Sequence, residues 1–380
     1  MAVMTLLSSV TSQWPSGFWP NIIKIFEVGS YAWTIVLFTI VLKLVLSPMD
    51  FLQRFFMNRQ TRAQAKLQPK LEKLQKQYGQ NQNLLYQKQN ELMAKSGVNM
   101  KASCITMLVY MVLTLTIFIT LFNSIRDISG FKIANQYKDL RQTYAITYDV
   151  GYLKDYLNMT DEDIESMYAK SGEERANFLA TFEQTKAIAE GLTVEQIKAH
   201  GEEIKSTAQD NVEARYFEIK DSWLWIKNIW IPDKATTSEI QSYSAYISST
   251  GDKGVLEEDY NNVMGKLQAR EKSVNGYYIL PILVVAITFL SQWISKKLST
   301  PKDSNGNKIQ QPSSGKFLMI LMPFMMLLFT LNSSAIFSIY IIVNSIMSTA
   351  LSPIITIICN KIEDKRERKS VEIAKPDYMR

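Results

Sequence analysis

One charged side chain, that of Lys43, lies inside the apolar stretch YAWTIVLFTIVLKLVLSPM of residues 31–49. As a helix, these 19 residues would reach roughly 28 Å, close to the ~30 Å thickness of the hydrocarbon core of a bilayer. We therefore expect the stretch to span a membrane. A charge at the centre of such a helix costs about 2.5–3.5 kcal/mol on insertion scales, so Lys43 needs water, protein or lipid headgroups around its ammonium group.

Two environments would satisfy Lys43. Its four-carbon stem could lift the ammonium group to the headgroups, since Pro48 at the end of the stretch is near. Alternatively, the ammonium group could lie in a polar cavity, because Thr39 and Ser47 are four residues away on either side and share its helical face. The stretch by itself leaves both interpretations open.

Residues suited to covalent or metal chemistry are few. His200 is the one histidine of the chain, which excludes His-based zinc sites and most acid–base triads. Cys104 and Cys359 lack the spacing of metal ligands. We expect neither an enzyme nor a protein with a cofactor or a metal site.

The apolar residues, 47% of the chain, are gathered in blocks. Five predominantly apolar blocks contain no Asp or Glu, which predicts an all-α polytopic membrane protein. The predicted transmembrane helices are 31–49, 102–125, 277–295, 316–331 and 335–357.

Charge predicts how these helices are oriented. Segment 50–101 has ten basic and three acidic residues, and both the loop 296–315 and the tail 358–380 are also basic. Basic short segments remain in the cytoplasm, so we expect an outside N-terminus and a cytoplasmic C-terminus. Residues 127–275 include 26 acidic and 17 basic residues, and segment 126–276 is expected to lie outside.

The segments between the spans have patterns of their own. Residues 1–30 combine Trp14 and Trp19 with a short amphipathic stretch, which is typical of an interfacial helix. In segment 50–101, leucines recur at helical spacing on both sides of a break at residues 79–83, which predicts a cytoplasmic helical hairpin.

The acidic segment is predicted to be a small helical domain. Three capping boxes mark helix starts, and three glycines are expected near helix ends. The boxes are Thr160 with Asp163, Ser171 with Glu174, and Thr193 with Gln196; the glycines are Gly172, Gly191 and Gly201. Three tryptophans that follow, Trp223, Trp225 and Trp230, suggest a return to the membrane interface.

Several separated motifs together resemble the YidC/Oxa/Albino family of membrane-protein insertases, in its bacterial YidC type. They occur in family order and cover all five predicted spans. They are Thr39 to Pro48, Leu67-Gln-Pro-Lys70, Gly97-Val-Asn99 with Cys104, Trp223-Leu-Trp-Ile226 with Asp233, Tyr278 to Pro281, Met322-Pro323, and Tyr340 with Asn344. The sequence departs from the family where Lys43 replaces an arginine and Tyr110 replaces a frequent glutamine.

The resemblance implies five helices around a hydrophilic groove that binds client proteins during insertion. It places Lys43 in that groove, where its charge would attract acidic client segments. The implied client-binding residues are Lys43, Thr39, Ser47, Tyr110, Thr114, Thr288 and Gln292. The expected partners are nascent membrane-protein clients, the lipid bilayer, the ribosome and the Sec translocon, with no specific nucleic acid.

Two other classes of protein remain alternatives. A secondary transporter would need ionisable coupling sites near the midplane or paired repeats, and the five predicted spans contain no Asp or Glu and do not divide into repeats. A membrane-anchored scaffold that presents segment 126–276 would explain that domain but not the polar faces of the spans.

Overall fold

The structure is a computed structural model that describes residues 13–95, 100–269, 273–299 and 314–373. These residues form helices and connecting segments, without β-strands apart from two isolated bridges. They divide into two compact units. Unit 1 comprises residues 1–32, 122–280 and 330–337, and unit 2 comprises 33–121, 281–329 and 338–380. The Gly97–Asn99 motif, and residues 300–313 of the predicted cytoplasmic loop, lie outside the described residues.

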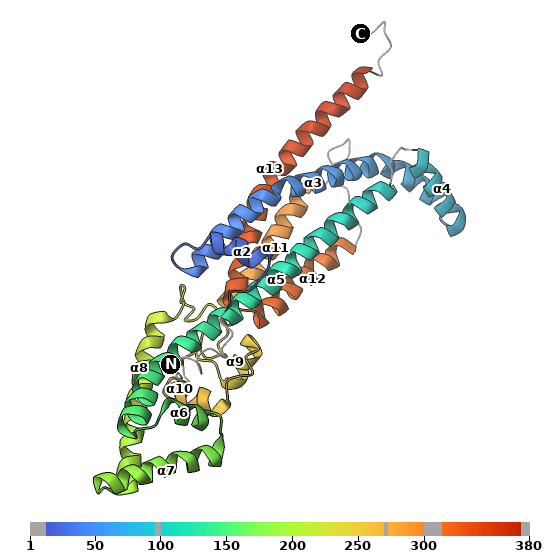
Figure 1. Cartoon of the computed structure of the whole chain (residues 1–380). Coiled ribbons are helices and arrows are strands. Elements are labelled where there is room, and N and C mark those ends of the chain that lie inside the picture. The colour runs from blue at the N-terminus through green and yellow to red at the C-terminus, as the bar shows by residue number, and fades with distance from the viewer. Residues whose placement is uncertain (1–12, 96–99, 270–272, 300–313, 374–380) are drawn as a thin grey trace. The chain divides into compact units, whose positions relative to one another are not determined.

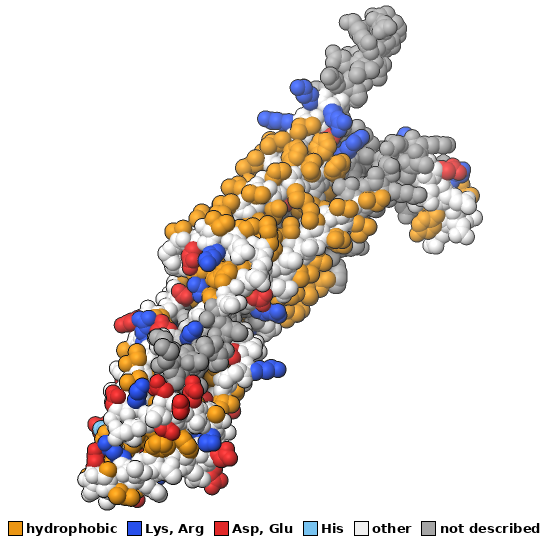
Figure 2. Space-filling view, viewed as in Figure 1, with side chains coloured by type: hydrophobic (Ala, Val, Ile, Leu, Met, Phe, Trp, Pro, Cys, Tyr) orange, Lys and Arg blue, Asp and Glu red, His pale blue; other side chains and the backbone are white. Residues whose placement is uncertain are grey.

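Long helices supply unit 2 (Figure 1). They are parts of α3 (Tyr31–Tyr78), α5 (Met100–Ala145), α11 (Ile279–Ser299), α12 (Ser314–Asn332) and α13 (Ala335–Ile373), with α4 (Gln82–Lys95). Three of the described stretches are long and apolar enough to cross a membrane: Tyr31–Arg59, Leu108–Tyr156 and Ala335–Arg366. Ile279–Ser295 and Pro323–Asn332 are shorter apolar helices. Apolar side chains gather over these helices in Figure 2, as expected of an all-α polytopic membrane protein.

Helix α3 continues well beyond the predicted span. It passes through Pro48 and Pro69 without ending, although each proline removes one backbone hydrogen-bond donor. A break follows at Gly79, and α4 begins at Gln82. The span and the first arm of the expected hairpin are therefore one helix, so a side chain just after Pro48 can still lie near Lys43.

Unit 1 contains most of the acidic segment and is helical. Its helices are α2 (Phe18–Ile25), the end of α5, the π-helix η2 (Ile146–Tyr156), α6 (Asp161–Tyr168), α7 (Gly172–Glu190), α8 (Val194–Ile219), α9 (Tyr243–Thr250) and α10 (Glu257–Ala269). One apolar cluster includes the buried side chains of Tyr152, Leu153, Ile164 and Ile197. Burial of these residues from η2, α6 and α8 gives the domain a core of its own.

The predicted helix ends are partly right. Thr160 and Thr193 form complete capping boxes, and Gly191 ends α7 in the left-handed conformation. Ser171 is the N-cap of α7, so this helix start is also right, although its side chain makes no capping bond, and Gly172 is the first residue of the same helix. The prediction for Gly201 is wrong, because Gly201 lies inside α8. Gly201 is needed there for packing, because a Cβ atom at this position would lie 2.6 Å from Cζ of the Tyr152 ring.

The return of the chain to the membrane interface near Trp230 stays a prediction, but the structure shows where the Trp230 side chain lies. It is buried in unit 1, where its ring packs edge-on against that of Tyr31 with 4.8 Å between centroids. Its Nε1 donates to Asp221 at 2.6 Å. Nearby, the buried Asp233 carboxylate accepts backbone N–H groups of Tyr277 at 2.7 Å and Leu280 at 2.7 Å, which caps the start of α11.

We predict that Gly201→Ala destabilises the chain. The added methyl group would displace the buried Tyr152 ring, and overpacking of this kind costs about 1–3 kcal/mol, more than the ~1 kcal/mol gained from helix propensity. Gly151→Ala is the matched control, because a Cβ atom added at this position in η2 would have no neighbour within 4 Å. Thermal unfolding of both variants in detergent would contradict the prediction if Gly201→Ala were as stable as the control.

Candidate functional site

Lys43 forms an ion pair inside unit 2. Its Nζ lies 2.7 Å from Oδ2 of Asp50, seven residues later on the same helix. The two side chains are only 14% and 19% exposed. From α5, the Tyr110 hydroxyl donates to Oδ1 of Asp50 at 2.8 Å. Two of the predicted site residues, Lys43 and Tyr110, are therefore joined through a carboxylate that the sequence pattern placed in the following loop.

The other predicted residues of α3 are bonded within their own helix. The buried Thr39 hydroxyl donates to the Ile35 carbonyl at 2.6 Å, and the Ser47 hydroxyl donates to the Leu44 carbonyl at 2.8 Å. Such bonds satisfy a hydroxyl among apolar helices without reaching a neighbouring helix. Within the described part of the chain, neither side chain contacts the Lys43–Asp50 pair through a hydrogen bond.

The remaining predicted residues lie on α5 and α11. Thr114 is exposed, one turn beyond Tyr110. On α11, Thr288 has a buried hydroxyl without a hydrogen-bond partner among the described residues, and Gln292 is half-buried one turn later. The structure therefore joins Lys43 and Tyr110 through Asp50, and a side-chain hydrogen-bonding interaction also links Thr114 to Tyr110. Among the described residues, no hydrogen bond links Thr288 or Gln292 to this group.

A second polar layer centres on Arg54, which in the sequence is only one of the basic residues of an expected loop. Its guanidinium donates from Nη1 to the Thr356 hydroxyl at 3.2 Å and from Nη2 to the Ser295 hydroxyl at 3.4 Å. The Ser295 and Ser352 hydroxyls are 3.4 Å apart. Arg54 thus connects α3 to α11 and α13.

The charges of the Lys43–Asp50–Tyr110 group and of the layer around Arg54 do not cancel. Lys43 and Asp50 neutralise each other, whereas no carboxylate of the described residues lies within 4 Å of the Arg54 guanidinium. The cluster formed by Lys43, Asp50, Arg54 and Tyr110, here called the polar cluster, therefore carries one net positive charge. Arg54 donates its hydrogen bonds to neutral hydroxyls and also interacts electrostatically with Asp50, so the net charge belongs to the cluster as a whole.

Beyond this cluster, polar pairs continue along α3 and α13. Asn58 donates to the Asn360 side chain at 2.7 Å, and Arg62 forms a 2.7 Å ion pair with Asp364. These pairs and the Arg54–Thr356 pair share one offset of 302 residues and follow each other at four-residue steps. The two helices therefore run parallel and in register along this seam.

Apolar helices with buried polar pairs define an integral membrane protein of the polytopic α-helical class. Residues 23–159 and 211–364 match the model of a family described as 60Kd inner membrane protein. The chain belongs to this family, which confirms the resemblance to YidC/Oxa/Albino proteins. The unmatched residues 160–210 contain α6, α7 and much of α8.

Two relatives are both described as membrane protein insertase YidC. The one from Oceanobacillus iheyensis is 32% identical over 109 residues, which are 28% of this chain and 40% of the relative. The one from Clostridium perfringens is 30% identical over 112 residues, which are 28% of this chain and 44% of the relative. The similarity thus covers less than half the length of either relative. The comparison with solved structures gave no match.

We predict that Asp50→Asn destabilises the chain by about 3 kcal/mol, because it leaves the Lys43 charge buried without a counter-ion. The double variant Lys43→Met/Asp50→Asn should recover most of that loss, since it removes both charges and keeps an acceptor for Tyr110. Glu91→Gln is the control: it breaks the exposed Lys88–Glu91 pair and should cost under about 1 kcal/mol. Unfolding in detergent tests this; additive losses in the double variant would show that the pair is not coupled.

Proposed function

We propose that the chain is a membrane insertase that helps client transmembrane proteins to insert and fold. The observation that carries the proposal is the polar cluster with one net positive charge among apolar helices, in a chain of the 60Kd inner membrane protein family. The relatives from Oceanobacillus iheyensis and Clostridium perfringens are, by their names, insertases of this kind. Insertion of this type requires no covalent chemistry.

The physical problem for an insertase is the polar flank that a client helix must bring across the bilayer. Desolvating that flank is costly. A hydrophilic groove at partial membrane depth would shorten the distance over which the flank crosses the hydrocarbon core without water. We propose that Lys43, Thr39, Ser47, Tyr110, Thr114, Thr288 and Gln292 line such a groove. The Lys43–Asp50 ion pair modifies the mechanism, because the charge available to a client is that of the whole cluster.

The electrostatic attraction between this charge and a client carboxylate is of a strength that suits transient binding. At about 6 Å and an effective dielectric constant of ~20, it is about 3 kcal/mol before desolvation. That is enough to favour an acidic segment transiently without trapping it. Arg54 and Lys43 share the single carboxylate of Asp50, so the cluster as a whole presents one positive charge on a strongly polar surface.

The same ion pair also bears on the alternative of a secondary transporter. Asp50 lies within the apolar stretch Tyr31–Arg59, so a carboxylate does occur in a helix that is able to cross the membrane. A transporter would use it as a coupling site that binds and releases a proton or ion. Direct pairing opposes this use, since Lys43 and the Tyr110 hydroxyl already occupy the two carboxylate oxygens that a coupling ion would need.

We predict that Arg54→Gln lowers insertion of an acidic-tailed client by roughly tenfold, as loss of about 1.4 kcal/mol of attraction would, and leaves a neutral-tailed version of the same client almost unchanged. Lys43→Met/Asp50→Asn keeps the net charge and should insert both clients like the wild type. Purified protein in liposomes with the two clients provides the measurement. Equal insertion of both clients by Arg54→Gln would contradict the charge mechanism, and no insertion above protein-free liposomes by the wild type would favour the transporter.

We further propose that the N-terminus lies outside, that segments 50–101, 296–315 and 358–380 are cytoplasmic, and that residues 126–276 are outside. The basic cytoplasmic segments would be the surfaces for the ribosome and for the Sec translocon. Unit 1 would then face the released parts of the clients.

The topology can be tested by labelling single cysteines in intact cells, after Cys104 and Cys359 are replaced. An impermeant thiol reagent should label a cysteine introduced by Ser249→Cys, whose position is exposed in unit 1, and not one introduced by Ser96→Cys. The reverse pattern would invert the proposed orientation.

A further inference from the structure

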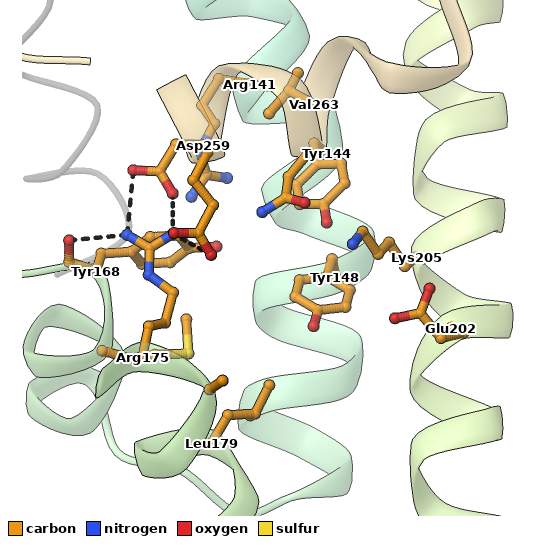
Figure 3. A pocket seen from close by; sticks show the side chains of 14 residues that line it. Arg141, Tyr144, Tyr148, Tyr168, Arg175, Leu179, Glu202, Lys205, Asp259 and Val263 are labelled. Carbon is orange, nitrogen blue, oxygen red and sulfur yellow. Dashed lines mark hydrogen bonds and ion pairs between the residues drawn. The ribbon is translucent and has the colours of Figure 1, made fainter. Parts of the chain in front are cut away.

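A cavity of about 200 Å³ lies inside unit 1, where side chains from α5, η2, α6, α7, α8 and α10 converge (Figure 3). It is smaller than the roughly 300–1,000 Å³ of pockets for drug-sized ligands, so it would hold a small molecule. Much of its wall comes from residues 160–210, which lie outside the family match.

Tyrosines form one wall of the cavity. Tyr144, at the end of α5, and Tyr148, in η2, have ring centroids 5.3 Å apart and both line the space. Neither hydroxyl forms a hydrogen bond with another described residue, and a tyrosine hydroxyl can donate as well as accept. With Leu179 and Val263, these rings give the cavity an apolar surface edged by hydroxyls.

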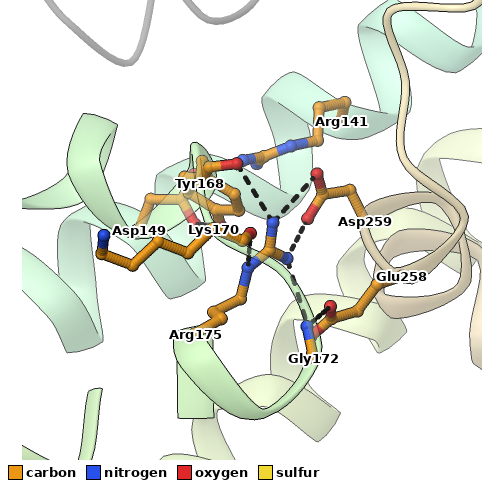
Figure 4. Close-up of polar contacts among 8 residues, drawn as sticks. All are labelled: Arg141, Asp149, Tyr168, Lys170, Gly172, Arg175, Glu258 and Asp259. Atoms are coloured by element: carbon orange, nitrogen blue, oxygen red, sulfur yellow. Dashed lines mark hydrogen bonds and ion pairs between the residues drawn. The ribbon is translucent and has the colours of Figure 1, made fainter. Parts of the chain in front are cut away.

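All three guanidinium nitrogens of Arg175 have acceptors within the protein (Figure 4). Its guanidinium pairs with the Asp259 carboxylate through Nη1 and Nη2, and it donates from Nε to the Lys170 carbonyl at 2.9 Å and from Nη2 to the Tyr168 carbonyl at 3.2 Å. Glu258 is 3.7 Å from Nη1 and also accepts the Gly172 N–H at 3.0 Å. These two carboxylates are committed to the protein itself.

Arg141 differs from Arg175 in having an uncommitted donor. Its Nη2 donates to Asp149 at 2.7 Å, and the other oxygen of that fully buried carboxylate accepts the Tyr168 hydroxyl at 2.6 Å. Nη1 of Arg141 is buried and has no hydrogen-bond partner among the described residues. A buried guanidinium N–H without an acceptor is costly, so an acceptor from outside the protein would be favoured here.

Lys205 on α8 adds a further donor to the wall. No carboxylate of the described residues lies within 4 Å of its ammonium group, although Glu202 is one turn away and also lines the cavity. The uncommitted polar groups are thus the donors of Arg141, Lys205, Tyr144 and Tyr148, opposed by the exposed carboxylate of Glu202. This balance favours a ligand that presents acceptors and carries no more than one negative charge.

We propose that this cavity binds a small organic carboxylate with an aromatic or apolar body. The carboxylate would accept from Nη1 of Arg141 and from the Lys205 ammonium group, since bonds between charged groups are the strongest of their kind. The body would pack against the tyrosine rings and Leu179. This inference does not depend on the proposed insertase function.

Phenylacetate is a suitable probe, and phenylacetamide is its neutral analogue. The full chain in nanodiscs of zwitterionic lipid is dialysed to equilibrium against each compound. We expect saturable binding of phenylacetate at least tenfold tighter than that of phenylacetamide. Absence of saturable binding, or equal affinity for the two compounds, would overturn the proposal.

Variants then assign the contacts. Arg141→Lys keeps a charge beside Asp149 but removes the Nη1 donor, and Lys205→Met removes the ammonium group; each should weaken phenylacetate binding about tenfold. Glu202→Gln should strengthen it several-fold, because it removes the repelling charge. If Arg141→Lys failed to fold, as judged by circular dichroism, Lys205→Met and Glu202→Gln would still decide the matter.

Lys198→Met is the matched control, because Lys198 is an exposed lysine of α8 that does not line the cavity. Its affinity for phenylacetate should equal that of the wild type. Weaker binding in Glu202→Gln would overturn the carboxylate assignment, since it would mean that Glu202 attracts the ligand. Equal losses of phenylacetate affinity in Lys198→Met and Lys205→Met would also overturn the assignment, because they would indicate only a general effect of surface charge.

Discussion

The cost of placing charge among apolar helices is the constraint on which unit 2 depends. Lys43 meets it by pairing with Asp50, and the Tyr110 hydroxyl satisfies the remaining oxygen of that carboxylate. Arg54 meets it differently, with neutral hydroxyls of α11 and α13 as acceptors. Three helices are thereby tied to α3 by polar contacts in a region where apolar packing alone gives little preference for one neighbour over another.

Much of the fold was accessible from the sequence. Apolar blocks without acidic residues predicted the all-α membrane class, and the capping boxes at Thr160 and Thr193 predicted helix starts correctly, because both signals are local. The glycine prediction failed at Gly201, where the reason for glycine is the Tyr152 ring 49 positions earlier in the chain. The burial of Trp230 could not be predicted for the same reason, since its partners Tyr31 and Asp221 come together only in the folded unit.

The residues of the polar cluster also differ in whether they could be identified from nearby sequence or only from partners far away in the chain. Lys43 could be identified from its apolar surroundings, and the seven-residue spacing to Asp50 was a usable signal once Pro48 was not taken as the end of the helix. Arg54 could not be identified in this way, because its partners Ser295 and Thr356 are more than 200 residues away. The uncommitted donor of Arg141 is likewise invisible in a sequence, where it resembles the fully bonded Arg175.

The constant offset between α3 and α13 limits how this chain can change during evolution. Segments between the two helices can lengthen or shorten freely, as the extra residues 160–210 illustrate, because loop length enters only weakly into stability. A single residue inserted within 54–62 or 356–364 would instead rotate every later side chain by about 100° and separate the following pairs at once. Length variation among relatives should therefore be concentrated outside residues 54–62 and 356–364. Within these two stretches the number of residues between successive paired positions has to stay constant.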